Sequence, residues 1–79
     1  MESQAIPLKQ LDVGKKATVL SLMVKGAVRR RMLDLGVIEG TEIASLFQSP
    51  SGNPVAYMIR GAVIALRSDI TSGIMVREC

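Results

Sequence analysis

Turn-forming residues recur so closely along this chain that no long helix fits between them. They fall at Val13-Gly14, Lys25-Gly26, Gly36, Glu39-Gly40, the run from Ser49 to Pro54, Gly61 and Gly73. Most of the pieces between them are about as long as a β-strand and are rich in Val, Ile, Leu or Thr. Five strands are therefore predicted, over Lys16–Leu22, Thr41–Phe47, Val55–Arg60, Ala62–Leu66 and Ile74–Arg77.

The alternation in the predicted strands is imperfect, and in the run from Val55 to Ile59 both faces are apolar. This pattern is expected when a sheet curls and its outer face is partly covered. Arg60-Gly61 lies between two strands and allows a tight reversal, because glycine accepts the positive φ of hairpin turns. A chain of 79 residues is too short for a second domain. We expect residues 1–79 to form a single, mainly β domain, a small barrel of about five strands.

One stretch, from Gly26 to Gly36, departs from the strand pattern and predicts a short inserted helix. At about 100° per residue, three apolar residues share one face: Val28, Met32 and Leu35. Arg30 and Asp34 lie opposite and are spaced for a weak ion pair. Gly36 is expected to end the helix in the left-handed conformation.

The residues that support catalysis or metal binding are scarce. The chain has no histidine and one cysteine, Cys79, and it contains no glycine-rich phosphate-binding loop. Glu39 and Glu42 are close in sequence, but a solvated turn explains them better than a metal site. The methionines lie mostly in apolar runs, where filling the core is their ordinary role. We expect no catalytic residue, no cofactor and no resident metal.

No apolar run approaches the roughly 20 residues of a membrane span, and the N-terminus lacks the pattern of a secretory signal. We therefore expect a cytoplasmic protein without direct membrane insertion. Cys79 is expected to stay a free thiol in a reducing compartment. We also consider that the chain associates weakly with copies of itself.

The net charge of +3 allows an acidic partner without requiring one. The triplet Arg29, Arg30 and Arg31 is positioned to contact phosphates, but Arg30 lies on the outer helix face whereas its two neighbours flank the apolar stripe. Phe47 and Tyr57 are the only aromatic residues, so few stacking platforms for bases exist. No nucleic acid is expected as a partner, and a small basic nucleic-acid-binding barrel is kept as the alternative.

Met23 and Val24 are two apolar residues in a connection where polar residues would be usual. If they are exposed, they form an apolar spot beside the outward Arg30, which is typical of a protein contact. We predict a partner-binding surface made of Met23, Val24 and Arg30. Capping of the barrel by the two apolar residues is the competing explanation.

The order of motifs resembles the ferrous iron transport protein A (FeoA) family. The resemblance rests on four blocks: Pro7-Leu8-x-x-Leu11-x-x-Gly14, the run from Arg29 to Ile43, Ser51 to Val55, and Arg60-Gly61-x-x-x-Ala65-Leu66-Arg67. Asn53 stands where that family often has aspartate, and Ala62 where a larger residue is frequent. The resemblance covers nearly all of the chain from Ile6 to Val76.

The resemblance implies an SH3-like β-barrel with a helix inserted after the first strand. It also implies a non-enzymatic cytoplasmic accessory protein that acts by protein-protein interaction with FeoB, a ferrous iron transporter with a cytoplasmic GTP-binding part. Similar domains occur at the end of iron-dependent repressors. The hypothesis that this chain is the regulatory domain of such a repressor is disfavoured, because no DNA-reading helix precedes the barrel.

Overall fold

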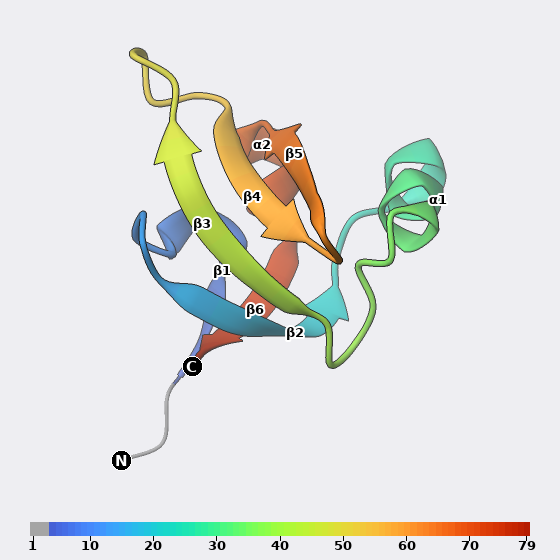
Figure 1. Ribbon diagram of the computed structural model, residues 1–79. Helices are drawn as coiled ribbons and strands as arrows, with labels where there is room; N and C mark the ends of the chain where they lie inside the picture. Colours follow the sequence, from blue (N-terminus) through green and yellow to red (C-terminus); the bar gives the residue numbers. More distant parts are fainter. Residues whose placement is uncertain (1–3) are drawn as a thin grey trace.

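A single curled antiparallel sheet is the framework of the protein in the computed structural model, which describes residues 4–79 (Figure 1). It has six strands: β1 (Ala5–Pro7), β2 (Lys16–Leu22), β3 (Glu42–Gln48), β4 (Val55–Ile59), β5 (Ala62–Leu66) and β6 (Ile74–Glu78). Their order in the sheet is β1-β6-β2-β3-β4-β5. The expected mainly β, barrel-like architecture is therefore confirmed, and β1 and β5 are the two edges of the sheet.

The sixth strand, β1, is absent from the sequence prediction of about five strands. It has three residues and ends at Pro7, and its only partner strand is β6, in an antiparallel pairing in which Ala5 faces Arg77 and Pro7 faces Met75. So short a segment carries no alternation of its own, and proline is tolerated because the strand is an edge. Residues 1–3 of the predicted domain lie outside the described residues.

Three helical segments connect the strands. They are the short 3-10 helix η1 (Leu8–Gln10), the helix α1 (Gly26–Asp34) and the single-turn helix α2 (Ser68–Thr71). Only α1 was predicted from sequence. Asn53 Oδ1 accepts a hydrogen bond of 3.0 Å from the Ser68 N–H, so the loop between β3 and β4 is tied to the start of α2.

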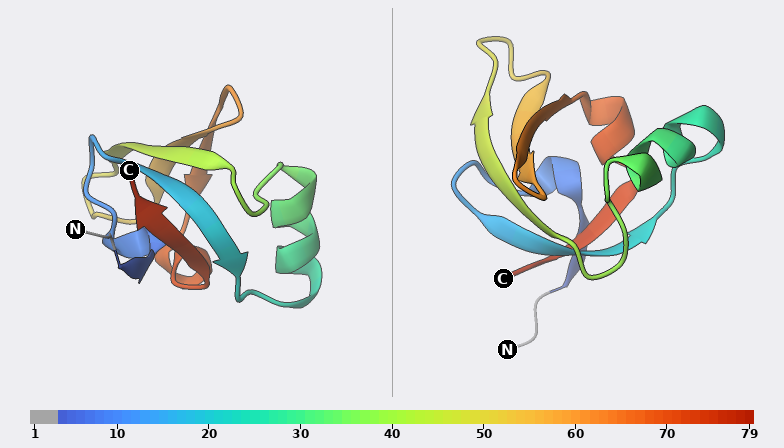
Figure 2. Two further views of the ribbon diagram at one scale, coloured as in Figure 1. Left: turned by 90° about the horizontal axis from the view of Figure 1, so that it is seen from below. Right: turned by 45° about the vertical axis from the view of Figure 1, so that its right-hand side comes forward.

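Helix α1 ends as the sequence indicates, because Gly36, which follows the C-cap residue Leu35, has a φ of +89°. Its apolar face is narrower than predicted. Met32 is fully buried and Leu35 packs against the core, but Val28, which the sequence places on the same face, is 37% exposed. The expected Arg30–Asp34 ion pair is also wrong: among residues 4–79 the only ion pair joins Arg67 and Asp69. The helix stands to one side of the curled sheet (Figure 2).

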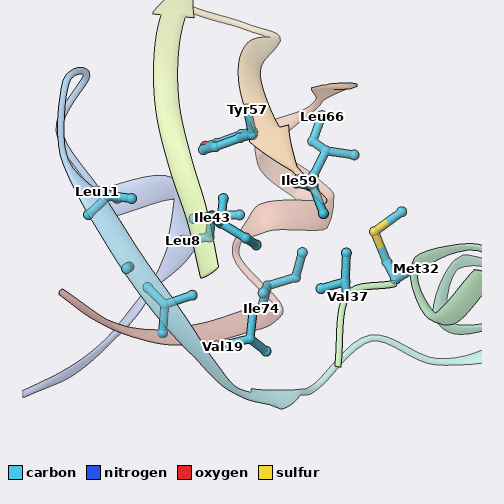
Figure 3. Packing of buried hydrophobic residues seen from close by; sticks show 12 residues of the cluster. Leu8, Leu11, Val19, Met32, Val37, Ile43, Tyr57, Ile59, Leu66 and Ile74 are labelled. Carbon is cyan, nitrogen blue, oxygen red and sulfur yellow. The ribbon is translucent and has the colours of Figure 1, made fainter. Parts of the chain in front are cut away.

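The core lies inside the curled sheet and is closed by side chains from η1 and α1 (Figure 3). Twelve buried residues form it: Leu8, Leu11, Ala17, Val19, Met32, Val37, Ile43, Tyr57, Ile59, Leu66, Ile74 and Val76. Figure 3 shows Met32 reaching from α1 toward Val37, Ile59 and Leu66. Met32 is the only residue of α1 that is fully buried.

The turn between β4 and β5 contacts the segment that follows α1. Arg60 and Gly61 both have positive φ, 49° and 83°, which makes the two-residue turn that the sequence predicted. The Arg60 side chain lies directly over Gly36, where a Cβ atom would collide with Arg60 Cδ. Gly36 is therefore needed both to end helix α1 and to leave room for the Arg60 side chain.

Replacing Met32 by alanine should destabilise the protein by about 2–5 kcal/mol, because a fully buried side chain is lost and a cavity remains. The neighbouring Leu33 is 41% exposed, so Leu33→Ala is the matched control and should cost less than about 1 kcal/mol. Urea unfolding followed by circular dichroism measures both. Equal losses in the two variants would show that α1 is not anchored by Met32.

Candidate partner-binding surface

Met23 and Val24 lie in the connection between β2 and α1, and the structure gives them different environments. The backbone N–H of Met23 donates to the carbonyl oxygen of Gly73, while its side chain is 65% exposed. Val24 is half buried and packs on the core, with its Cγ1 against Gly73. A Cβ on Gly73 would lie 2.7 Å from this atom. Met23 is thus available to a partner, whereas Val24 mainly fixes the loop.

The three arginines of α1 point in different directions, as the sequence analysis expected. Arg29 Nη1 donates a hydrogen bond of 3.2 Å to the carbonyl oxygen of Leu22, so this side chain folds back onto the end of β2. Arg30 is exposed and, at 100° per residue, lies about 160° around the helix from the buried Met32. It is the cation of α1 that faces most directly away from the barrel.

The segment around α1 exposes more apolar surface than the sequence indicated. Besides Met23, three large apolar residues here are exposed: Val28, Leu33 and Ile38, at 37%, 41% and 49%. They are exposed because α1 buries one residue, Met32, and leaves its other apolar side chains at least partly in solvent. The sequence analysis placed only Val28 on the apolar stripe of the helix and gave no position to Leu33 or Ile38.

The same segment also concentrates positive charge. Residues 25–36 contain four cations and one carboxylate, a net charge of +3, which equals the formal net charge of the whole chain. Lys25 and the three arginines are all exposed. Apolar side chains among cations suit a contact with an acidic surface, where burial and long-range attraction act together.

A second feature is a cavity of about 310 Å³ near the loop before β2 and the start of α2. Its buried wall carries the hydroxyls of Ser45, Tyr57 and Thr71, and its rim carries Lys9 and Asp12. Ser45 Oγ is buried and has no hydrogen-bond partner among the described residues. The cavity offers hydroxyl groups without histidine, so no side chain there is placed to activate a nucleophile.

The residues with metal-binding side chains are dispersed. Within residues 4–79, no three acidic or cysteine side chains come together in a group that could hold a metal ion. Glu39 and Glu42, the pair considered from sequence, are both exposed. Cys79 is an exposed free thiol, and its Sγ lies 3.6 Å from Thr18 Oγ1.

None of the helices in the described part of the chain has the length and apolar character needed to cross a membrane.

Comparison with known proteins gives a consistent match. Residues 6–78 match the family model described as FeoA domain. The FeoA protein from Chlorobium tepidum is 33% identical, with a TM-score of 0.87 over 92% of this chain and 70% of that one. FeoA from Stenotrophomonas maltophilia, solved with zinc, is 26% identical, with a TM-score of 0.79 over 87% of this chain and 86% of that one. No curated protein sequence matches.

The Stenotrophomonas protein is described as a prokaryotic SH3 domain protein and as a candidate bacterial ferrous iron transport activating factor. The SH3-like fold class expected from the sequence is therefore confirmed. T. acidophilum IdeR is 19% identical, with a TM-score of 0.82, and this chain covers 36% of its length. At that identity the likeness shows the fold alone.

Val24→Asp should destabilise the protein by about 1–3 kcal/mol, because a carboxylate would replace a half-buried side chain that packs on the core. Met23→Asp adds the same charge one residue away on an exposed side chain and should change stability by less than about 0.5 kcal/mol. Thermal unfolding of both variants separates the two roles. If the two variants are equally stable, the packing of the Val24 side chain contributes no more to stability than that of Met23.

The stability of the protein should fall above about pH 10 in part because of Tyr57. Burial raises the pKa of the Tyr57 hydroxyl, while a hydrogen bond with Thr71 lowers it less. The stabilising contribution is complete below the tyrosine pKa of the unfolded chain, about 10, and is lost as pH rises toward the higher folded pKa. Urea unfolding between pH 9 and 11 should show a smaller decline for Tyr57→Phe than for the unchanged protein.

Proposed function

The chain belongs to the FeoA domain family, and from this premise we propose that it is a non-enzymatic, cytoplasmic accessory protein of ferrous iron transport. It acts by binding the cytoplasmic GTP-binding part of a FeoB-type transporter. The observation that carries the proposal is the family match over residues 6–78, together with the transport-activating role suggested for the Stenotrophomonas relative. The transport chemistry then belongs to the partner.

The surface around α1 supports a role by association. Met23 presents an exposed thioether side chain before the helix, and Arg30 presents a guanidinium group on the outward face. An exposed apolar side chain supplies contact area that is desolvated on binding, and an exposed cation speeds the encounter with an acidic partner. We keep Met23 and Arg30 as the contact residues and assign Val24 the role of holding their loop in place.

Binding to nucleic acid is less well supported by the same surface. Tyr57 is buried, which leaves Phe47 as the exposed aromatic residue. Arg29 is bonded to the end of β2, so the triplet does not form a row of three free cations. A phosphate-binding surface would show an affinity that falls steeply with salt.

Met23→Asp and Arg30→Glu should each weaken binding of the FeoB cytoplasmic part at least fivefold, because each places a carboxylate in the proposed contact. Val13 is also exposed, at 48%, and its loop lies across the molecule from α1 (Figure 1), so Val13→Asp is the control and should bind as the unchanged protein does. Isothermal titration calorimetry measures the affinities.

If both α1-side variants bind at full strength while the unchanged protein binds, the contact surface is elsewhere. If the unchanged protein does not bind, and instead binds a DNA or RNA oligonucleotide with strong salt dependence, the nucleic-acid alternative replaces the proposal.

A further inference from the structure

Strand β5 is an edge of the sheet whose outer backbone groups have no partner. It pairs with β4 on one side only. Within residues 4–79, neither Val63 nor Ala65 makes a backbone hydrogen bond to any further segment. An unpaired strand edge is a template for another extended segment, and natural proteins usually protect such an edge with charges or proline.

The tight turn before β5 determines which of its groups face outward. In a two-residue hairpin of this type, the residues that flank the turn, Ile59 and Ala62, form a hydrogen-bonded pair. The pairing alternates along the ladder, so Ile64 also bonds to β4. Val63 and Ala65 therefore direct their N–H and C=O groups away from β4, toward the free edge.

Neither a charged residue nor a proline protects β5. Its sequence is Ala-Val-Ile-Ala-Leu, without charge or proline, and Val63 is 56% exposed. The outer face of the neighbouring strands is also apolar: Val63 is paired with Met58, and Ala65 with Ala56, which in turn faces the 60% exposed Phe47. An added strand would thus gain hydrogen bonds at the edge and apolar contacts on this face.

The electrostatics around this edge favour an acidic occupant. In Figure 1 and the right-hand view of Figure 2, α1 lies on the side of β5 that faces away from β4. Two contacts hold it there: Met32 reaches toward Leu66 (Figure 3), and Arg60 lies over Gly36. Residues 25–36 therefore bring their net charge of +3 to this side.

A second copy of the chain is a poorer occupant than an acidic segment. Antiparallel pairing of two β5 strands would bring a second α1, with the same net positive charge, to the same interface. Like charges across an interface are unfavourable. Nucleic acid would match the charge but offers no amide groups in the spacing that the edge presents.

We propose that the β5 edge binds an extended, apolar segment flanked by acidic residues, which adds to the sheet as a seventh strand beside β5. The inference rests on the proposed function and names the mode of binding: the segment belongs to the cytoplasmic part of the transporter. Val63 and Ala65 supply the backbone hydrogen bonds, and the cations of α1 meet the acidic residues.

Amide hydrogen exchange followed by NMR tests the edge directly, with the FeoB cytoplasmic part as the probe. In the free protein the Val63 and Ala65 amides should exchange rapidly, and in the complex their exchange should slow at least tenfold. The Ile64 amide, which bonds to β4, is the internal control and should be protected in both states. Unchanged exchange of Val63 and Ala65 in a saturated complex would overturn the inference and leave the proposed function intact.

Two variants test the same edge by affinity. Ala65→Pro removes an outward N–H and is tolerated at an edge, because proline there costs no ladder bond. Val63→Glu places a carboxylate where the acidic segment would lie. Each should weaken binding tenfold or more, whereas Val13→Glu, with the same charge change at another exposed valine, should change it less than twofold. Unfolding midpoints of all three confirm that they fold.

The remaining outcomes are distinct. If both edge variants bind as tightly as the unchanged protein, the β5 edge is not the contact. If the Val63 and Ala65 amides become protected in the free protein as its concentration rises, the occupant is a second copy, and the inference is wrong. If the unchanged protein does not bind the probe at all, the proposed function fails, and the inference fails with it.

Discussion

The burial of Met32 is the contact on which the arrangement of the surface depends. It is the only side chain of α1 that is fully buried, and it enters the core from the side of the sheet where β5 ends the ladder. A nine-residue helix is marginal on its own, so its position comes from tertiary contacts. Together with the contact of Arg60 over Gly36, this anchor keeps the exposed cations and apolar side chains of α1 beside the sheet edge instead of free in solvent.

Two features of recognition meet on this side of the molecule. The helix contributes positive charge and exposed apolar groups, and β5 contributes unpaired backbone groups within an uncharged strand. Each feature alone is common on protein surfaces. Their proximity is what suits an acidic, extended partner, because backbone pairing gives register and charge gives orientation and encounter rate.

The fold was predictable where a local rule decides the conformation. Gly36 ends α1, and Arg60-Gly61 reverses the chain, because both need positive φ. The elements that the sequence analysis did not predict, such as β1 and α2, have no local sequence pattern. At the surface, the exposure of Met23 and Arg30 agrees with the prediction, while Val24 packs on Gly73, 49 positions further along the chain. A contact over that separation leaves no trace in either local sequence.

The amino-acid order alone determined the number and placement of the main strands and the inserted helix. It also determined the positively charged segment and the scarcity of side chains for catalysis. These depend on short-range periodicity, turn residues and counts. The tertiary structure alone decided which apolar residues remain in solvent, which strand forms the edge and that α1 stands beside it. Those properties depend on how segments far apart in the chain pack, since Met32 can be buried only where Leu66 and Ile59 leave room for it.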